Sequence, residues 1–361
     1  MARKQNGQNG QNGGQKTGSK VRVMMLGGLN EIGKNLAVIE YENDMIIIDC
    51  GLAFPDEDML GVDLVIPDFT YLEKNASKIR GILITHGHED HIGGLPYLLK
   101  ELDVPVYGTR LTLGILESKL AEHRLLGERE LVTVEAGTIL KLGVFKCEFI
   151  RVNHSIADAC MIAVRTPEGT ILHTGDFKLD VSPIGGEMMD LTRIGEYGRE
   201  GILLLMCEST NVEKPGFTPS ERKVGASLDM IFMTNTDKRI IIATFSSNVH
   251  RVQQIINSSA KFGRKVAVTG RSMLNVVGAA VRLGYMEVPK GVLIDIADIN
   301  RYPREQITIV TTGSQGEPMS ALYRMAFADH SQVELTPNDL VVLSSHAIPG
   351  NEKLVGRIIN E

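Results

Sequence analysis

Short apolar runs separated by tight turns fill the first part of the chain. Leu36 to Tyr41 and Met45 to Asp49 are two such runs, joined by the turn sequence Glu42-Asn43-Asp44, and this spacing is typical of antiparallel strands. The same pattern predicts strands at Val21 to Leu26, Gly81 to Thr85, Leu131 to Val134, Thr138 to Leu142, Phe145 to Val152, Ala159 to Thr166, Thr170 to Thr174 and Ile202 to Cys207, and helices at Ile92 to Leu102 and Leu111 to Arg124. This part predicts an α/β layered fold rich in antiparallel pairs.

After about Phe217 the pattern changes to a plain alternation of one strand and one helix. Strands are expected at Arg239 to Phe245, Lys265 to Thr269, Gln306 to Thr311 and Leu340 to Leu343, with helices through Gln253 and Ile256, at Met273 to Leu283, at Met319 to Ala326 and from Asn351 onward. Such βα units imply a parallel sheet wrapped by helices. We therefore expect one domain at residues 21–217 and a second at residues 218–361.

The amino-acid composition indicates a soluble protein without disulfide bonds or a membrane span. The chain has 361 residues, of which 43% are hydrophobic and 23% charged, as in a soluble protein of about two domains. Its four cysteines form no Cys-x-x-Cys pair, which argues against a disulfide framework and favours a reducing, cytoplasmic setting. No apolar stretch reaches transmembrane length, so we expect no membrane span.

Residues 1–20 are rich in Gln, Asn and Gly and contain no acidic residue. Because such a segment buries almost no apolar surface, we expect it to be a disordered tail. The net charge of −6 does not by itself indicate a nucleic-acid partner. It does not exclude one either, because bound metal ions and a local groove can hold phosphates on an acidic protein.

The most informative segment is His86-Gly87-His88-Glu89-Asp90-His91, directly after an expected strand. Neutral imidazole and carboxylate groups are preferred ligands of Zn²⁺ and similar ions. His86 and His88 are two positions apart, so on an extended segment they point the same way and can share one ion. Asp90 and His91 follow and could serve a second ion. A His-rich solvated turn is the alternative, but clustered ligands at a strand end favour a two-metal hydrolase site.

Two more residues complete the expected ligand set. His154 and Asp176 both follow strands, at positions where a fold gathers ligands from distant parts of a sequence. The first ion would then be held by His86, His88 and His154, with Asp176 bridging to the second ion, which Asp90 and His91 would complete. Asp49 and Glu208, each closing a strand, are candidates for carboxylates that orient the imidazoles.

Small polar residues follow each strand of the second domain, at Ser246-Ser247-Asn248, Gly270-Arg271-Ser272, Gly313-Ser314-Gln315-Gly316 and Ser344-Ser345-His346. Because ligands bind at the carboxyl ends of parallel strands, where helix N-termini attract phosphate, this edge is a candidate anion site. Arg271 adds the planar guanidinium that suits phosphate. By contrast, Gly28-x-x-x-x-Gly33-Lys34-Asn35 departs from the phosphate loop of nucleotide hydrolases, because Asn35 replaces the required Ser or Thr and a strand follows. We therefore expect no nucleotide cofactor.

The His-x-His-x-Asp-His run with His154 and Asp176 resembles the metallo-β-lactamase superfamily. Four further motifs resemble the bacterial ribonuclease J family, in the beta-CASP branch of that superfamily; they are Gly27 to Asn35, Cys207 to Thr210, Gly313 to Pro318 and Ile348 to Glu352. The resemblance runs from about Val21 to Glu361. It implies an α/β fold in which an incomplete metallo-β-lactamase αββα sandwich carries an inserted beta-CASP domain of parallel βα units.

The resemblance also implies an activity. RNA would lie between the two domains over two Zn²⁺ ions, with Mn²⁺ or Mg²⁺ also able to support activity. Members of the family cleave RNA as 5′-to-3′ exonucleases and as endonucleases, in rRNA maturation and mRNA decay, which implies a homo-oligomer or an RNA-decay complex. The residues that match the family's catalytic motifs are Asp90, Asp176 and Glu208, and those near its 5′-monophosphate pocket are Ser247, Asn248, Ser314 and Glu317.

The chain departs from the family near its end. Members carry two further histidine motifs and a C-terminal domain, to which neither His250 nor His346 corresponds, and the chain stops within an expected helix. We therefore expect a C-terminally truncated chain with a weaker second metal site. Two other functions stay open: a small-molecule metallo-hydrolase of the same superfamily, such as a thioesterase or lactonase, and a non-catalytic RNA-binding subunit of a decay complex.

Overall fold

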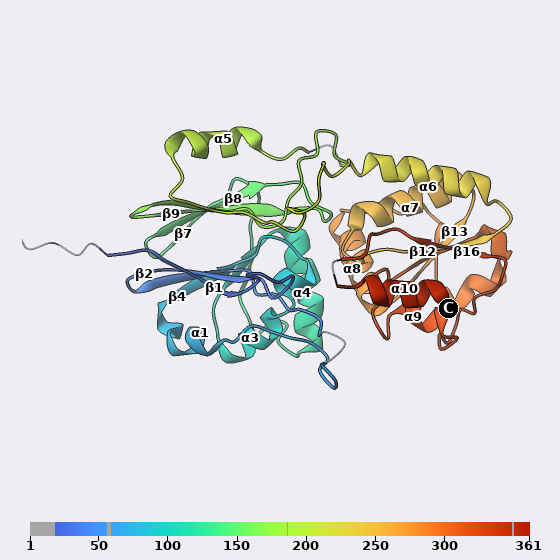
Figure 1. Cartoon of the computed structure of the whole chain (residues 1–361), viewed down its shortest axis with the longest axis horizontal. Coiled ribbons are helices and arrows are strands. Elements are labelled where there is room, and N and C mark those ends of the chain that lie inside the picture. Colours follow the sequence, from blue (N-terminus) through green and yellow to red (C-terminus); the bar gives the residue numbers. More distant parts are fainter. Residues whose placement is uncertain (1–18, 56–58, 186, 349) are drawn as a thin grey trace, which may run out of the picture.

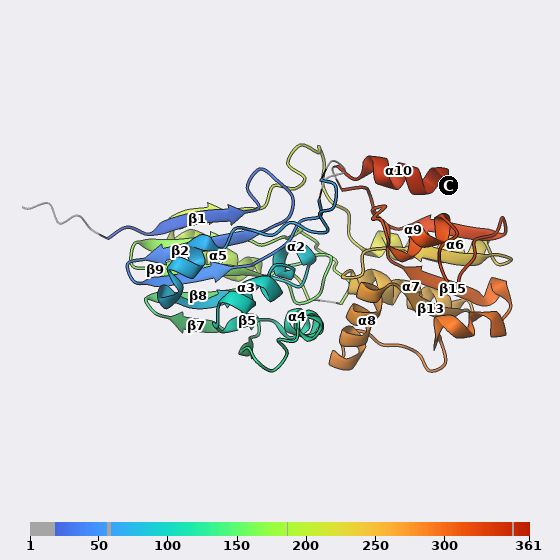
Figure 2. The same ribbon diagram turned by 90° about the horizontal axis from the view of Figure 1, so that it is seen from below.

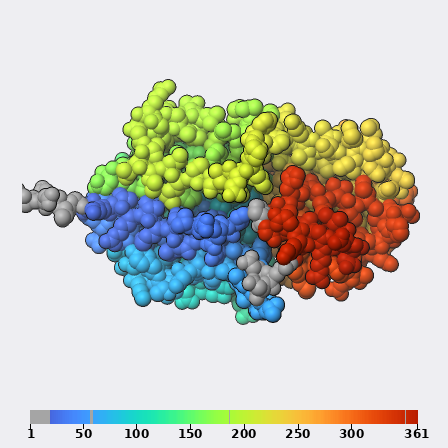
Figure 3. Space-filling view, in the orientation of Figure 1, coloured from blue at the N-terminus to red at the C-terminus, as the bar shows by residue number. Residues whose placement is uncertain are grey.

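The computed structural model describes residues 19–55, 59–185, 187–348 and 350–361. Of the expected disordered tail at residues 1–20, residues 1–18 lie outside the described part. The described residues form two lobes that touch along one side (Figures 1 and 3). Within these ranges, none of the helices has the length and apolar character needed to cross a membrane.

Two β-sheets stacked face to face form the first lobe. One sheet has the strand order β1-β2-β3-β4-β5-β6, and the other has the order β11-β10-β9-β8-β7. The bounds of these strands are β1 Arg22–Gly27, β2 Leu36–Tyr41, β3 Asp44–Ile48, β4 Ile79–Leu83, β5 Val106–Gly108, β6 Leu131–Thr133, β7 Ile139–Leu142, β8 Phe145–Arg151, β9 Cys160–Thr166, β10 Gly169–His173 and β11 Leu204–Met206. Consecutive strands from β1 through β3 pair antiparallel, and so do consecutive strands from β7 through β10, as the turn pattern predicts.

Alternation of side chains along each strand creates two apolar layers. Ile39 and Ile46 of the first sheet share a buried cluster with Phe149 of the second sheet, whereas Ile47 points to the other face and shares a cluster with Leu98. The helices of this lobe are α1 Thr70–Lys74, α2 Glu89–Ile92, α3 Leu95–Glu101, α4 Arg110–Glu122 and α5 Leu191–Glu200, with a 3-10 turn at Ala76–Lys78. Helices α1, α3 and α4 lie on one side of the stacked sheets and α5 on the other (Figure 1), so the expected αββα layering is confirmed.

The second lobe is a parallel sheet of the order β14-β13-β15-β12-β16, with every neighbouring pair parallel. Its elements are α6 Arg222–Thr234, β12 Arg239–Ala243, α7 Val249–Lys261, β13 Lys265–Thr269, α8 Arg271–Leu283, β14 Leu293–Ile294, β15 Ile307–Thr311, α9 Ala321–Ala326, β16 Asp339–Leu343 and α10 Glu352–Asn360, with 3-10 turns at Ile296–Arg301 and Arg304–Gln306. Apolar residues of α7 and α8 pack on one face of the sheet and those of α9 and α10 on the other. The expected parallel βα domain is therefore confirmed. The boundary at residues 217 and 218 stays a prediction.

One expected helix is shorter than predicted. Within Ile92 to Leu102, helix α3 begins at Leu95, and Gly93 and Gly94 separate it from α2, which ends at Ile92. The backbone N–H of Gly94 donates to the carbonyl of Cys50 at 2.9 Å, and a Cβ on Gly94 would lie 2.6 Å from the carbonyl oxygen of Gly51. Both glycines keep a right-handed helical backbone, and their lack of a side chain lets this stretch pack directly on the segment after β3.

Helix α5 is held by Ile194 and Tyr197, which pack on the apolar core, and by polar contacts to Glu148. Buried Glu148 on β8 accepts hydrogen bonds from Nε and Nη2 of Arg193, both at 2.7 Å, and from the hydroxyl of Tyr197 at 2.5 Å. Neither this helix nor α6 is predicted by the hydrophobic pattern. Strand β11 is also shorter than the expected run at Ile202 to Cys207. It lies at a sheet edge, where Leu205 is 55% exposed.

Candidate metal centre

Loops at the ends of three strands bring the six predicted ligands together. His86 and His88 follow β4, Asp90 and His91 lie in α2, His154 follows β8 and Asp176 follows β10. One ligand atom from each of His86, His88, His154 and Asp176 lies within 4.8 Å of the others, and the same holds for Asp90, His91 and Asp176. Asp176 is common to both groups, as expected for a bridging carboxylate. Had His154 or Asp176 lain outside reach of His86 and His88, the metal interpretation would have failed.

Three imidazole nitrogens converge in the first group. Nδ1 of His88 lies 2.9 Å from Nε2 of His86 and 3.1 Å from Nε2 of His154. Two imidazole lone pairs repel each other, so such spacing needs a proton or a cation between the rings. Neutral imidazole and carboxylate form the ligand set that divalent ions such as Zn²⁺ prefer. The donors of this group therefore fit a divalent cation.

The second group is held by a buried pair. Nε2 of His91 lies 3.5 Å from Oδ2 of Asp90 and 3.4 Å from Oδ1 of Asp176. On the opposite side of the ring, Nδ1 of His91 lies 2.7 Å from Oδ2 of Asp49. Asp49 is 1% exposed, and its carboxylate also accepts hydrogen bonds from the backbone N–H and the hydroxyl of Thr85, each at 2.8 Å. Asp49 thus orients an imidazole, as the sequence predicts.

Charge and burial set the protonation of these rings. Burial lowers the pKa of His86 well below its usual range and lowers the pKa of His154 to about 3, so both rings are neutral at pH 7 and their lone pairs are available. Burial alone would also lower the pKa of His91. The surrounding carboxylates, of which Asp90 and Asp176 contribute most, outweigh burial and raise that pKa well above its usual value. A cation bound at His91 would therefore displace a proton.

Asn35 belongs to the site and was not among the predicted residues. Its Nδ2 atom lies 3.0 Å from the carbonyl oxygen and 3.3 Å from Oδ2 of Asp90, and 3.1 Å from Nε2 of His91. The motif Gly27 to Asn35 was noted in the sequence only as a resemblance and as a failed phosphate loop. Its position directly before β2 was the signal that could have placed Asn35 at the same sheet edge as the ligands.

Glu208 has a different environment from Asp49. Its backbone N–H donates to the hydroxyl of Thr174 at 3.1 Å, and its carboxylate accepts from the backbone N–H of Thr210 at 2.8 Å. Across the described part of the chain it makes no hydrogen bond to an imidazole. The expectation that Glu208 orients a ligand ring is thus not met, and its catalytic role stays a prediction.

The expected anion edge of the second lobe contains both buried and open side chains. Asn248 is buried and its Oδ1 accepts from the backbone N–H of Arg251, which caps α7. Ser314 is also buried. Ser247 is partly exposed and Arg271 is exposed at the start of α8, and burial raises the pKa of Glu317. Asn248 therefore has a structural role in the first turn of α7, while contact of these residues with RNA stays a prediction.

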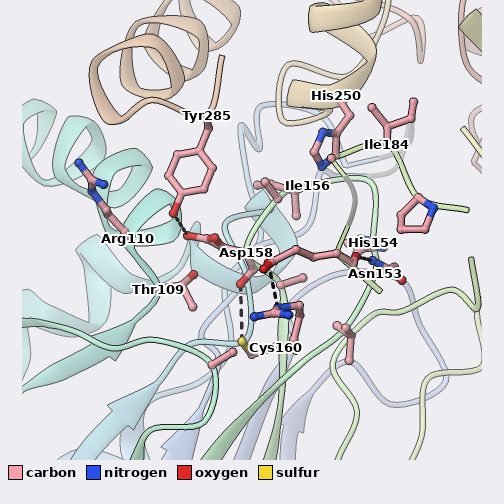
Figure 4. A pocket seen from close by; sticks show the side chains of 18 of the residues that line it. Thr109, Arg110, Asn153, His154, Ile156, Asp158, Cys160, Ile184, His250 and Tyr285 are labelled. Atoms are coloured by element: carbon pink, nitrogen blue, oxygen red, sulfur yellow. Dashed lines mark hydrogen bonds and ion pairs between the residues drawn. The ribbon is translucent and has the colours of Figure 1, made fainter. Parts of the chain in front are cut away.

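A cavity of about 580 Å³ lies where the two lobes meet. Its wall includes the predicted ligand His154 from the first lobe and His250 and Tyr285 from the second, as Figure 4 shows. Arg110 and Lys178 also line it. One of the six predicted ligands, His154, therefore lines a space bounded by both lobes, and the wall of this space carries both cationic and acidic side chains.

Comparisons with known proteins agree with this architecture. The model of the "Metallo-beta-lactamase superfamily" matches residues 30–187, and the model described as "Ribonuclease J, beta-CASP domain" matches residues 237–361. A solved structure of a protein of unknown function from Enterococcus faecalis V583 has a TM-score of 0.63 at 19% identity and covers 95% of this chain and 92% of that one, which supports the fold alone. The chain therefore carries a metallo-β-lactamase domain joined to a beta-CASP domain.

Relatives define the family more closely. Proteins named Ribonuclease J from Synechocystis, Helicobacter pylori and Thermus thermophilus are 47%, 48% and 46% identical to this chain and cover 92%, 95% and 94% of it. Over its two matched domains, the chain is therefore similar to the ribonuclease J family. It spans 52%, 50% and 60% of the lengths of these three relatives.

Proposed function

We propose that this chain is the metal-binding and RNA-binding part of a ribonuclease that hydrolyses phosphodiester bonds. One observation carries the proposal: six His and Asp side chains from three separate segments converge in two groups that share Asp176. The similarity to proteins named Ribonuclease J supports RNA as the substrate. By the same analogy we propose 5′-to-3′ exonuclease and endonuclease activity, in rRNA maturation and mRNA decay, in the cytoplasm and within a homo-oligomer or a decay complex.

We assign the metal ligands as His86, His88 and His154 for one ion and Asp90 and His91 for another, with Asp176 shared. A pair of bound ions, proposed to be Zn²⁺ with Mn²⁺ or Mg²⁺ able to support activity, would supply an activated water and would stabilise charge on a phosphoryl transition state. The chain's own contribution is orientation. Asp49 and Thr85 hold one edge of His91, and Asn35 holds Asp90.

The carboxylates of the site have proposed catalytic roles. Burial alone would raise the pKa of Asp176, but the nearby histidines, His91 above all, lower it far below its usual range. Asp176 therefore stays ionised at neutral pH and is suited to ligation. Asp90 and Glu208 are the proposed partners that hold or accept a proton as water attacks the phosphate. For RNA contacts we propose the carboxyl edge of the second sheet, at Ser247, Asn248, Arg271, Ser314 and Glu317.

The test is cleavage of defined RNA by the intact protein. A 5′-monophosphorylated RNA labelled at its 3′ end is incubated with Mn²⁺ or Mg²⁺, with and without EDTA, and products are resolved by length. The proposal predicts release of mononucleotides that EDTA abolishes. Absence of EDTA-sensitive release would reject the exonuclease, and hydrolysis of a thioester or lactone in its place would favour a small-molecule hydrolase. Fewer than one metal ion per chain with full RNA affinity would favour a non-catalytic RNA-binding subunit.

A further inference from the structure

We infer that the second lobe positions two of the metal ligands, and that Tyr285 and Glu221 are the positioning residues through which it does so. The inference rests on the proposed metal centre. His154 and Asp176 lie on separate loops of the first lobe, after β8 and β10, and each loop is bonded to a side chain of the second lobe or of the segment that leads into it. The arrangement of the lobes thereby sets where these two ligand atoms lie.

The loop that carries His154 is fixed at Asp158. Oδ2 of Asp158 accepts two hydrogen bonds, from the backbone N–H of Leu111 at 2.8 Å and from the hydroxyl of Tyr285 at 2.7 Å (Figure 4). Asp158 has a φ of +64°, in the left-handed region that non-glycine residues occupy only when the surroundings hold them there. These two bonds anchor its side chain. One donor is the first turn of α4 and the other comes from the second lobe.

Tyr285 is itself held in place by helix packing. It follows α8, after a left-handed turn at Gly284 with φ of +81°. Helix α8 lies against α4 (Figure 2), and the contact is close, since a Cβ on Gly114 of α4 would lie 2.5 Å from Cδ1 of Leu283. The hydrogen bond from the hydroxyl of Tyr285 therefore ties the position of the His154 loop to the position of α8.

The loop that carries Asp176 is fixed through Lys178. The backbone N–H of Lys178 donates to the carbonyl of Asn153 at 2.7 Å, which bonds the two ligand loops to each other next to His154. The ammonium group of Lys178 lies 3.4 Å from Oε1 of Glu221, just before α6. Asn153 is next to the predicted ligand His154, and Lys178 is two positions after the predicted ligand Asp176. Glu221 directly precedes the first helix of the second lobe.

Glu221 continues this connection into the second sheet. Its Oε2 accepts from Nε and Nη2 of Arg251 on α7, at 3.0 and 2.7 Å. Nη1 of Arg251 in turn donates to the carbonyl and the hydroxyl of Ser344 after β16, at 2.6 and 2.8 Å. The side chains of Lys178, Glu221 and Arg251 are only 11–15% exposed, so solvent screens these charges less than it would at an open surface.

Metal affinity depends on small displacements of the ligand atoms. Coordinating atoms must lie within a few tenths of an ångström of their ideal distances, and the groups that hold the ligands affect affinity nearly as much as the ligands do. Because His154 and Asp176 have one such anchor each in or beside the second lobe, removing an anchor should disturb the metal centre without removing a ligand.

The experiment compares two anchor variants of the intact protein with matched controls. Tyr285→Phe removes one hydroxyl, and Tyr302→Phe is its control, because Tyr302 packs by Lys265 at the opposite, amino end of β13. Glu221→Gln removes the charge beside Lys178, and Asp229→Asn on α6, the helix that follows Glu221, is its control because Asp229 pairs with Lys261. Three readouts are measured: Zn²⁺ affinity by competition with a chelator, the visible absorption of the Co²⁺-loaded protein, and amide exchange of residues 153–159 in the metal-free protein.

We expect both anchor variants to bind Zn²⁺ about tenfold more weakly. A loss of this size is the smallest usually seen when a metal ligand loses its hydrogen-bond partner. Their Co²⁺ spectra should change, and in Tyr285→Phe residues 153–159 should exchange faster. The controls should match the wild type. Unchanged affinity and spectrum in both anchor variants would overturn the inference. If the wild type binds no divalent metal, the proposed function fails, and amide exchange alone then decides whether Tyr285 holds the loop.

Discussion

Nδ1 of His91 lies 2.7 Å from Oδ2 of Asp49, although the two residues are 42 positions apart in the sequence. This contact fixes which edge of the His91 ring faces the carboxylates of Asp90 and Asp176, because a ring nitrogen that donates to Asp49 leaves the other nitrogen free to bind. The buried pair also connects the end of β3 with α2. The orientation of one proposed ligand thus depends on a residue that binds no cation itself.

Replacing Asp49 by Asn should weaken metal binding about 10- to 100-fold, the usual effect of losing the carboxylate behind a metal-binding imidazole. The amide keeps the size of the side chain but loses its charge. Calorimetric titration with Zn²⁺ measures the change. Asp103→Asn, an exposed position after α3, serves as the control, and equal affinities for Asp49→Asn and the wild type would refute this role.

Replacing Asn35 by Ala should reduce the number of ions bound at limiting metal concentration. Asn35 contacts Asp90 and His91, which belong to only one of the two ligand groups. We therefore expect the ion held by those two residues to be lost first, while the group of His86 and His88 keeps its ion. Metal content after dialysis measures this, with Asn43→Ala in an exposed turn as the control. Equal loss of both ions would contradict the assignment.

Replacing Arg271 by Ala should weaken RNA binding and leave metal content unchanged. The exposed guanidinium at the start of α8 is a proposed phosphate contact, and one lost contact lowers the slope of log affinity against log salt by about one unit or slightly less. Fluorescence anisotropy with a labelled RNA at several salt concentrations measures the slope. In the control variant Arg301→Ala, which changes a residue near the amino end of β15, the slope should stay as in the wild type.

The pH dependence of the free energy of unfolding should show the contribution of the Glu148 carboxylate. Burial alone would raise the pKa of this carboxyl, but hydrogen bonds from Arg193 and Tyr197 lower it below its usual 4.5. The folded protein therefore binds this proton more weakly than the unfolded chain. The stability that Glu148 contributes is complete above its usual pKa of 4.5 and is lost as pH falls through the lowered pKa. Urea unfolding from pH 6 to pH 3 should show a smaller loss in Glu148→Gln than in the wild type. A parallel loss in both would exclude this contribution.

Much of this architecture could be predicted because local signals agree with the final contacts. The strand at Leu36 to Tyr41 is apolar on both sides since both faces are buried, and the ligand histidines stand in one short segment. Helix α5 gave no such signal. Its only buried side chain is Tyr197, and Gly195 and Gly198 weaken its intrinsic preference. Besides the packing of Ile194 and Tyr197, an ion pair from Arg193 and a hydrogen bond from Tyr197 to Glu148 hold it, and those contacts are visible only in three dimensions.

The parts of the site that escaped sequence analysis share a physical cause. Asn35 is an amide, which is no typical ligand, and it meets Asp90 across 55 positions. Tyr285 meets Asp158 across 127 positions and Lys178 meets Glu221 across 43. Such contacts arise from how the lobes pack, and no short motif records them. Clustered ligands and the strand-end carboxylate Asp49 were predictable, whereas Asn35, Tyr285 and Glu221 were not.

The most direct test of the whole account is a comparison of His88→Ala with the wild type in one set of measurements. Bound metal, RNA affinity and EDTA-sensitive cleavage of 5′-monophosphorylated RNA are measured on the intact protein, with His123→Ala, a histidine packed against Tyr97 away from the ligands, as the control. We predict that His88→Ala loses metal and cleavage but keeps most of its RNA affinity. Cleavage at the wild-type rate without His88 would contradict the account.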